Sequence, residues 1–339
     1  MSDSSATAPN AAEPTTASAE PFRECARTNW IGRVNLWLVS GVLGLLGVCF
    51  VLTLFWAFTS LAYHNWFFET YRFFTWMLVI FVFLAVFQLF VVQRFGSSAR
   101  DCSFRPLDAP RVHVGLTAWN DEEAIQTAVR EFKACPEVHR VVVVDNDSRD
   151  ATAAAAQAAG ADAVVVETEP GYGACCTRAL QEAAVGADVV VLCEGDMTFR
   201  AADVKKLLAY LENTDLVLGT RATQELREID TQMDWLINPC NQIVAKLAQT
   251  RFWGTRLTDM GCTYRAMRVD AWQALEPRLS VTGNHFSPHM FIEALKLRMR
   301  VIEVPIVFRK RVGLSKGVGN NKLKAAKVAW AMLKLIYRA

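Results

Sequence analysis

The sequence predicts a doubly wound α/β domain that follows a pair of membrane-spanning helices. From Arg111 onward, short apolar runs alternate with helical stretches. These runs are almost continuous in valine and leucine, as in parallel strands that are covered on both faces. Before Arg111 there are two long uncharged apolar runs, which predict the spans. With 339 residues, the chain has room for one large domain and an appendage.

The composition excludes some classes of protein. The hydrophobic fraction of 52% and the mean hydropathy of +0.17 are high for a wholly soluble protein. The net charge of +2 lacks the basic excess of a nucleic-acid-binding protein. The nine cysteines are scattered without the CxxC spacing of a zinc or redox site. We therefore interpret them as reduced thiols in a cytosolic compartment.

Residues 1–30 are expected to form a disordered cytoplasmic tail. The first part of this segment is mostly alanine, serine, threonine, proline and glutamate, with no apolar periodicity. Such a composition cannot bury enough apolar surface to offset the entropy lost on ordering. The segment also lacks a basic region followed directly by an apolar stretch, so it does not resemble a signal peptide.

Residues 31–98 are expected to hold two transmembrane helices, within the apolar runs 36–63 and 73–92. Each run reaches the roughly 20 residues that cross a bilayer core. A pair of buried helices of a soluble protein is the alternative, which the absence of charges disfavours. We expect a short linker over 64–72. The positive-inside rule places both ends of the hairpin in the cytoplasm, on the strength of the arginines at Arg23, Arg27, Arg33, Arg94 and Arg100.

Residues 105–318 are expected to form the α/β domain. Its predicted strands are 112–116, 141–144, 163–166, 189–193 and 216–218, and its predicted helices are 121–134, 151–159, 174–184 and 202–211. Polar segments follow the first four strands, at 117–123, 145–152, 169–173 and 194–198. Because ligands of such sheets bind outside the carboxyl ends of the strands, these segments are the candidate site. Taken singly, each is weak evidence, since Asp and Asn there are often helix caps and Gly-x-Gly is often a turn.

Two carboxylates are harder to explain as caps. Asp145 and Asp196 each end an apolar strand, where a buried charge is costly unless it meets a cation or a donor. Glu194 lies two residues before Asp196, so both can turn toward one ion. Hard oxygen ligands suit Mg²⁺ or Mn²⁺ bound to phosphates. Since the chain has no Walker-type Gly-Lys-Ser/Thr motif, we expect the metal to hold a diphosphate largely by itself.

Over 111–324 the sequence resembles family 2 glycosyltransferases of the GT-A fold, and among them the polyprenyl- and dolichyl-phosphate sugar synthases. Residues 118–122 are similar to the family's A-Y-N-E-E, 145–152 to D-D-G-S-x-D-G-T, and 194–196 occupy the D-x-D position. The resemblance implies metal ligands at Glu194 and Asp196. It also implies a nucleotide site made of Ala118, Trp119, Asn120, Asp121, Asp145, Asp147, Gly171, Gly173 and Gly195.

Later motifs resemble the lipid-phosphate branch. Residues 218–221 look like the G-S-R segment, 259–265 like D-x-x-x-G-F-R, and 304–316 like E-V-P-V-x-F-x-x-R-x-x-G-x-S-K with a shorter gap. The resemblance implies an acceptor-phosphate site at Arg221, Arg309, Arg311, Ser315 and Lys316. It further implies catalytic roles for Asp196, Arg221, Arg265 and Arg311. A solvated run of charge is the alternative interpretation of 309–311.

The family implies inverting, metal-dependent transfer of a sugar from a UDP- or GDP-sugar to a polyprenyl or dolichyl phosphate at the cytoplasmic membrane face. A glycolipid or glycan acceptor is the alternative, as is a catalytically impaired nucleotide-sugar-binding membrane protein. Thr117, Glu194 and Thr198 depart from the usual Pro, Asp and Gln. The departure at Thr198 leaves the third metal ligand open. The Q-x-x-R-W of polymer-forming relatives is absent. Whether the protein forms a homo-oligomer is also open.

Two further segments allow two interpretations each. His285 and His289 have the i, i+4 spacing of a metal pair, but Pro288 between them favours a loop near the acceptor. Residues 319–339 place several lysines among apolar residues. This pattern suits a basic amphipathic helix on the membrane surface, and equally an amphipathic helix packed on the domain.

Overall fold

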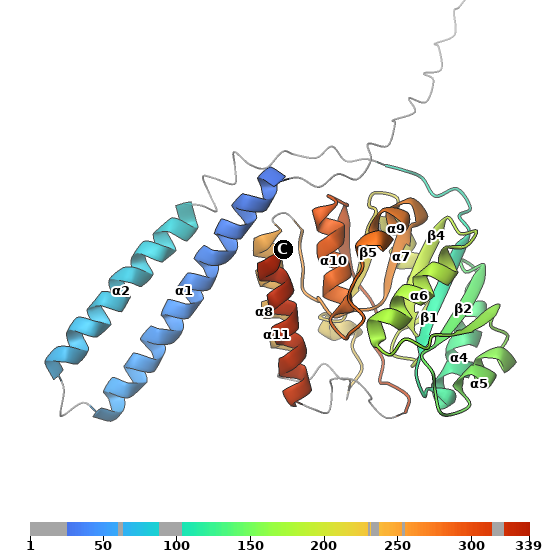
Figure 1. Ribbon diagram of the computed structural model, residues 1–339, viewed down its shortest axis with the longest axis horizontal. Helices are drawn as coiled ribbons and strands as arrows, with labels where there is room; N and C mark the ends of the chain where they lie inside the picture. The colour runs from blue at the N-terminus through green and yellow to red at the C-terminus, as the bar shows by residue number, and fades with distance from the viewer. Residues whose placement is uncertain are drawn as a thin grey trace, which may run out of the picture.

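The computed structural model describes residues 26–59, 64–87, 104–229, 231, 237–252, 255–313 and 322–339. Two long helices, α1 (Ala26–Thr59) and α2 (His64–Phe87), form a hairpin beside an α/β domain (Figure 1). Their windows Trp30–Phe55 and Phe68–Phe87 are long and apolar enough to cross a membrane, with mean hydropathies of 2.5 and 1.9. In the most apolar 18-residue stretch of each window, almost no side chain is buried, as is usual for a surface that contacts lipid.

The predicted linker over 64–72 is wrong, because these residues form the first turns of α2. The prediction took each span to end where the uncharged run ends. A helix can extend beyond such a run when its polar side chains pair with one another. Glu69 and Arg72 do so in an ion pair of 2.8 Å at i, i+3 spacing. The connection 60–63, the end of the second predicted span at 88–92, and residues 1–25 lie outside the described residues.

The domain is built on a seven-stranded sheet in the order β3-β2-β1-β4-β6-β5-β7. The strands are β1 (Val112–Ala118), β2 (Arg140–Asp145), β3 (Ala163–Val166), β4 (Val189–Glu194), β5 (Leu216–Thr220), β6 (Arg265–Arg268) and β7 (Val301–Pro305). The doubly wound sheet is confirmed, and the first five predicted strands are found within two residues of their predicted ends. The sheet is not wholly parallel, however, because β6 runs antiparallel to both β4 and β5.

Helices cover both faces of the sheet. The α-helices of the domain are α4 (Glu122–Lys133), α5 (Thr152–Ala158), α6 (Tyr172–Ala184), α7 (Val204–Leu211), α8 (Ile237–Arg251), α9 (Val269–Leu275), α10 (Phe286–Lys296) and α11 (Lys322–Arg338). Among the described residues, 3₁₀ turns lie at Ala201–Asp203, Gln224–Leu226 and Glu276–Arg278. Val142 and Val144 of β2 face the α6 side, and Val141 and Val143 face the α4 side. Both sets are fully buried, which explains the unbroken valine run.

Helix α11 packs on the domain, as one of the two interpretations of the tail predicted. Ile336 is buried in the core together with α8 and α10, while Lys327, Trp330 and Lys334 lie on the outer side. The Lys334 ammonium lies 5.7 Å from the centre of the Trp330 ring. This outward face has the composition of an interfacial surface, so packing on the domain and contact with a membrane are compatible.

The first turns of α1 also pack on the domain, beside α8 and α11 (Figure 1). Leu36 is buried in the same apolar core as Ile336, and the Trp37 ring meets the Tyr337 ring edge-on with centroids 5.3 Å apart. The Ser40 hydroxyl contacts the hydroxyl of Tyr337. The N-terminal part of α1 is therefore a component of the domain, and the exposed apolar stretch begins after it.

Candidate active site

The polar segments that form the candidate site follow the adjacent strands β2, β1 and β4, so they lie together at the carboxyl ends of these strands. Three non-glycine residues of these segments adopt left-handed backbone angles: Asn120, Asp147 and Met197, with φ of 50°, 53° and 68°. Such angles cost energy and persist where the surroundings enforce them, which often occurs at functional sites. Three of the five such non-glycine residues of the described structure therefore lie in the segments of the candidate site.

The end of β2 and the turn after β1 are joined by side chains. The Ser148 hydroxyl donates a short hydrogen bond to Asp145, and it accepts one from the Asn120 backbone N–H at 2.7 Å. The Arg149 N–H donates to the side-chain oxygen of Asn120 at 2.7 Å. Burial raises the pKa of Asp145. Trp119 is 47% exposed beside this group.

Asp196, two residues after the end of β4, has a carboxylate whose charged form is destabilised by its surroundings. Its side chain is buried, and its Oδ1 accepts hydrogen bonds from the Thr198 backbone N–H at 3.0 Å and from the Thr198 hydroxyl at 2.5 Å. Burial, followed by the charge of Glu194, raises the pKa of Asp196 to about 7, against the opposing effects of Arg311 and Thr198. A carboxylate in this state gains stability from any added cation.

The donor set fits a hard divalent cation that shares its coordination with a ligand. Within the described residues, no group of three or more His, Cys, Asp or Glu side chains could hold a metal. Two carboxylates, Glu194 and Asp196, are close enough to raise the pKa of Asp196. Mg²⁺ typically takes one or two carboxylates and completes its shell with phosphates and water. Thr198, the position where the third ligand was in question, is occupied in holding Asp196.

Arg311 reaches this carboxylate from the segment that follows β7. Its Nη1 lies 3.3 Å from Asp196 Oδ2, and its Nη2 donates to Asp121 Oδ1 at 2.9 Å. The adjacent backbone is tied to the same loop, since the Val312 N–H donates to the Asp196 carbonyl oxygen at 3.3 Å. Arg311 therefore sits between a residue of the expected nucleotide site and a residue of the expected metal site. Its contacts therefore lie at the expected nucleotide and metal sites and not at the expected acceptor-phosphate site.

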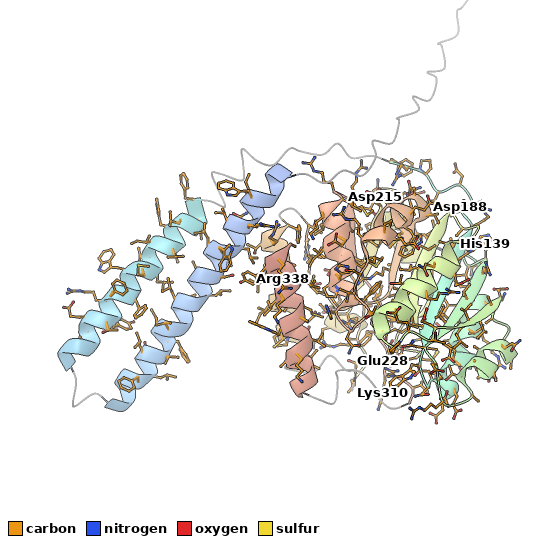
Figure 2. The ribbon with its side chains drawn as sticks, in the orientation of Figure 1. His139, Asp188, Asp215, Glu228, Lys310 and Arg338 are labelled. Atoms are coloured by element: carbon orange, nitrogen blue, oxygen red, sulfur yellow. The ribbon has the colours of Figure 1, made fainter. Side chains whose placement is uncertain are left out.

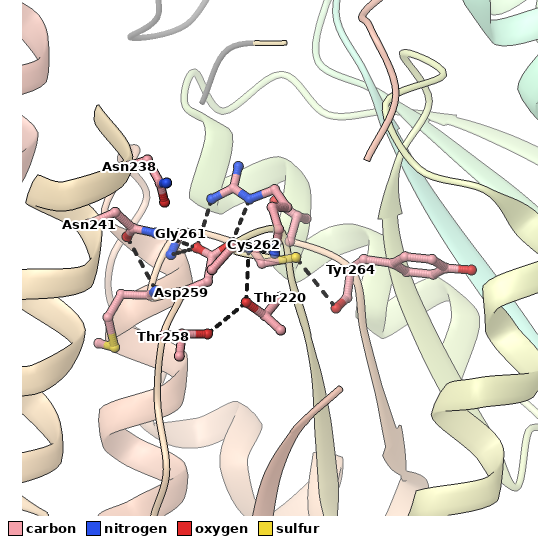
Figure 3. Close-up of polar contacts among 12 residues, drawn as sticks. Thr220, Asn238, Asn241, Thr258, Asp259, Gly261, Cys262 and Tyr264 are labelled. Carbon is pink, nitrogen blue, oxygen red and sulfur yellow. Dashed lines mark hydrogen bonds and ion pairs between the residues drawn. The ribbon is translucent and has the colours of Figure 1, made fainter. Parts of the chain in front are cut away.

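A second ion pair lies at the end of β5 (Figure 3). Arg221 donates to both oxygens of Asp259, from Nε at 2.7 Å and from Nη2 at 2.8 Å. Asn241 also donates to Asp259, at 2.8 Å. Burial alone would raise the pKa of Asp259, but Arg221 and Asn241 outweigh it and hold that pKa at about 2. Arg221 Nη1 contacts no polar group of the described residues, so this one nitrogen is left for a ligand.

Glu303 of β7 supports this pair; it stands at the first position of the E-V-P motif, but no role was predicted for it. Its carboxylate accepts hydrogen bonds from the backbone N–H of Thr258, at 2.7 Å, and from that of Asp259, also at 2.7 Å. These bonds fix the loop that carries Asp259. The available signal was a carboxylate within an apolar strand, the same argument that identified Asp145 and Asp196.

Two of the predicted arginines are held by other parts of the chain. Arg265 is almost completely buried, and its guanidinium donates to the carbonyl oxygens of Cys262 and Ser287 at 2.7 to 3.2 Å. Arg309 pairs with Glu131 of α4 at 2.8 Å and also donates to a backbone carbonyl. Neither contacts Glu194 or Asp196 in the described structure. Ser315 and Lys316 lie outside the described residues.

The three glycines of the expected nucleotide site, Gly171, Gly173 and Gly195, allow close contacts between backbone segments. The Gly173 N–H donates to the Thr282 carbonyl oxygen at 2.6 Å, and a Cβ on Gly171 would lie 2.4 Å from the same oxygen. The Gly195 N–H donates to the Thr117 carbonyl oxygen at 2.9 Å, which ties β4 to β1 at the rim. In the described structure these glycines bring neighbouring loops together around the site.

The expectation of a loop at His285 and His289 is wrong. His285 caps α10, and the helix runs through His289 with Pro288 in its first turn. Proline is tolerated there because the first turn has no partner for its missing N–H. His289 is buried, and its Nε2 accepts the Ser280 N–H at 3.2 Å, so that nitrogen is not available to a metal. Burial lowers the pKa of both histidines.

The family assignment follows from comparison with known proteins. Residues 114–275 match the model of glycosyl transferase family 2. The chain therefore carries a glycosyl transferase family 2 domain. An uncharacterised glycosyltransferase of Mycobacterium tuberculosis is 38% identical over 111 residues, 32% of this chain and 48% of that protein. The chain thus spans about half the length of that relative. The chain is also 29% identical over 261 residues to the polyprenol monophosphomannose synthase of Mycolicibacterium smegmatis, covering 72% of this chain and 95% of that one.

Solved structures confirm the GT-A fold of the domain. The glucosyl-3-phosphoglycerate synthase of Mycobacterium tuberculosis, solved with Mn²⁺, uridine diphosphate and phosphoglyceric acid, aligns with a TM-score of 0.52 and 18% identity. The alignment covers 67% of this chain and 78% of that one. The identity is too low to transfer its substrates, so the comparison establishes the architecture.

Proposed function

We propose that this chain transfers a sugar from a nucleoside diphosphate sugar to a polyprenyl phosphate, at the cytoplasmic face of a membrane and with inversion at the anomeric carbon. The observation that carries the proposal is the buried Asp196 beside Glu194, on the rim that also holds Asp145 and Arg311. The polyprenol monophosphomannose synthase, similar over 72% of this chain, supports the class of acceptor. The apolar hairpin supports a lipid substrate.

Glu194 and Asp196 would hold Mg²⁺ or Mn²⁺, as is consistent with the Mn²⁺ and uridine diphosphate bound together in the glucosyl-3-phosphoglycerate synthase. When bound, the metal supplies positive charge that neutralises the departing diphosphate. Arg311 would bind the same diphosphate, since its guanidinium lies between Asp121 and Asp196 and matches phosphate oxygens bidentately. Trp119 and Asp145 would bind the base and ribose.

The acceptor phosphate is an anion and needs no strong base to attack. One of its oxygens forms a bond to the anomeric carbon while the bond from that carbon to the diphosphate oxygen breaks on the opposite face, which inverts the configuration. The chain must bring two anions together, which requires a cation on the acceptor side. Arg221 fits this role, because Asp259 fixes its orientation and leaves Nη1 for a ligand.

The proposal is tested with the purified full chain, short polyprenyl phosphates and a panel of UDP- and GDP-sugars in Mg²⁺ or Mn²⁺. We expect a lipid-linked sugar that disappears in Asp196→Asn and persists in Asp188→Asn. Asp188 is a matched control, an exposed partner of Arg111 at the opposite end of β4 (Figure 2). Product with a glycolipid or glycan alone would favour the alternative acceptor. Binding of a nucleotide sugar without turnover would favour an impaired binding protein.

The orientation has a separate test. Single cysteines at Asn65 and at Ser315, in a background without exposed cysteines, are labelled in intact cells with a reagent that cannot cross the membrane. We expect labelling at 65 and none at 315 until the cells are opened. Labelling at 315 in intact cells would contradict the cytoplasmic placement that the flanking arginines indicate.

A further inference from the structure

Glu194 is held by two hydroxyl groups from different parts of the chain. The Tyr172 hydroxyl donates to Glu194 Oε1 at 2.7 Å, and the Thr263 hydroxyl donates to the same oxygen at 2.7 Å. The two hydroxyl groups also contact each other. Tyr172 begins α6, and Thr263 lies just before β6. One carboxylate oxygen therefore joins three segments that are distant in sequence.

The backbone around Tyr172 is fixed by the two glycines beside it. Gly171 has a φ of 135°, a conformation that side chains rarely adopt. A Cβ on Gly171 would lie 2.4 Å from the Thr282 carbonyl oxygen, and one on Gly173 would lie 2.3 Å from that of Val281. The close approach of these two stretches of backbone needs glycine on both sides of the tyrosine. In this structure the Gly-Tyr-Gly turn therefore aims a tyrosine at Glu194.

The two donors leave Glu194 with one oxygen for a ligand. Both hydrogen bonds end on Oε1, so Oε2 is the oxygen that a cation can approach. Glutamate has one more rotatable bond than aspartate and loses more conformational freedom when its carboxylate is fixed. Hydroxyl donors on one oxygen remove that freedom in advance. They also explain why a longer side chain stands here, since the carboxylate must reach Tyr172 and Thr263 as well as the ligand.

We propose that Tyr172 and Thr263 are positioning residues that set the orientation of Glu194 toward the divalent cation. The inference rests on the proposed function, because it takes Glu194 as a metal ligand. Groups that hydrogen-bond to metal ligands typically change metal affinity about 10- to 100-fold when removed.

The experiment measures Mn²⁺ binding by electron paramagnetic resonance, using the full chain with UDP or GDP. Tyr172→Phe removes only the hydroxyl, and we expect about a tenfold loss of Mn²⁺ affinity. Thr263→Val should give a similar loss. The double variant should lose much less than the product of the two losses, because both hydroxyls hold the same oxygen. Tyr264→Phe is the matched control, since that buried hydroxyl donates to the backbone of Arg200 and should leave Mn²⁺ affinity unchanged.

A second variant separates reach from charge. Glu194→Asp keeps the carboxylate but shortens the side chain. In the wild-type background it should strongly reduce Mn²⁺ affinity. In the Tyr172→Phe background the same substitution should reduce Mn²⁺ affinity only slightly further, because the hydrogen bond from Tyr172 is already lost. Wild-type Mn²⁺ affinity in Tyr172→Phe, in a protein whose Asp196→Asn variant binds no Mn²⁺, would overturn this inference and leave the proposed function standing. A wild-type chain that binds no Mn²⁺ with either nucleotide would overturn both.

Discussion

Two aspartate–arginine pairs on one rim of the sheet show opposite electrostatics. Asp259 meets Arg221 through two contacts of 2.7 and 2.8 Å, receives Asn241 as well, and has a pKa of about 2. Asp196 shares Arg311 with Asp121 across 3.3 Å, and its pKa is about 7. The first carboxylate is satisfied by the chain itself. The second is only partly neutralised by Arg311. A bound cation would therefore stabilise the charged form of Asp196 further.

The largest expected effect separates the pairs by stability. Asp259→Asn removes one partner of a buried, bidentate pair, and the guanidinium left behind should cost about 3–5 kcal/mol of unfolding free energy. Asp196→Asn should change stability by less than about 1 kcal/mol, because it removes a carboxylate that is itself destabilised by burial. Thermal unfolding of the purified chain without metal measures both. An equal loss in the two variants would show that Asp196 is also a structural charge.

The next largest effect concerns the arginines. Arg311→Ala should weaken binding of the nucleoside diphosphate with Mn²⁺ by about 10- to 100-fold, as expected for a charge-assisted hydrogen bond worth about 1.5–3 kcal/mol. Arg311→Lys should recover only part of this loss, because lysine lacks the planar fork. Calorimetry gives donor affinity, and the KM for polyprenyl phosphate reports acceptor use. A change in acceptor KM alone would instead favour the acceptor role that the sequence motif implied.

The dependence on pH should also distinguish the Asp196–Arg311 pair from the Asp259–Arg221 pair. A carboxylic acid whose pKa is raised to about 7 is increasingly protonated below that pH, and the protonated form cannot bind a metal. Mn²⁺ affinity should therefore fall by about tenfold per pH unit below pH 7. The depressed pKa of Asp259 means that the Arg221 pair contributes its stability at all pH values above about 4, and that this contribution is lost only as the pH falls toward about 2. Loss of Mn²⁺ binding at pH 6 with unchanged circular dichroism is the expected result, and flat affinity from pH 8 to 5.5 would contradict it.

The smallest effect tests the redundancy of the satisfied pair. Asn241→Ala removes one of several hydrogen bonds to Asp259, so it should cost about 1 kcal/mol of stability and leave Mn²⁺ affinity unaltered. The same unfolding and resonance measurements apply. A variant as unstable as Asp259→Asn would show that Arg221 alone does not hold the carboxylate.

The sequence predicted the part of the fold that local pattern determines. Valine runs located β1 to β5, and the carboxylates after them located the rim, because parallel strands present their carboxyl ends together. Strand β6 was missed since it has four residues, with arginine at both ends, and pairs antiparallel between strands far away in sequence. Helix α10 was missed because the position of Pro288 in a first turn depends on where the helix begins.

For the site, residue types were predictable and partners were not. The sequence identified Arg221, Arg265 and Arg311 as one group of cations. The structure gives each a different environment: a bidentate carboxylate, two backbone carbonyl oxygens, and a shared position between two carboxylates. For Arg221 and Arg311 these environments arise from tertiary contacts between segments more than 30 residues apart, with Asp259 and with Asp196 respectively. Spacing along the chain carries no information on such contacts.

Helix α1 has a mechanical consequence. It is one continuous helix of 34 residues, whose first turns are packed into the domain through Leu36 and whose later turns form the apolar stretch. A rigid rod joined to the domain in this way transmits rotation, since each residue inserted between the two parts would turn one against the other by about 100°. Under the proposed membrane placement, the rotational phase of this single helix would set the height of the domain above the bilayer and its orientation about the membrane normal. The position at which a lipid phosphate enters would then be set as well.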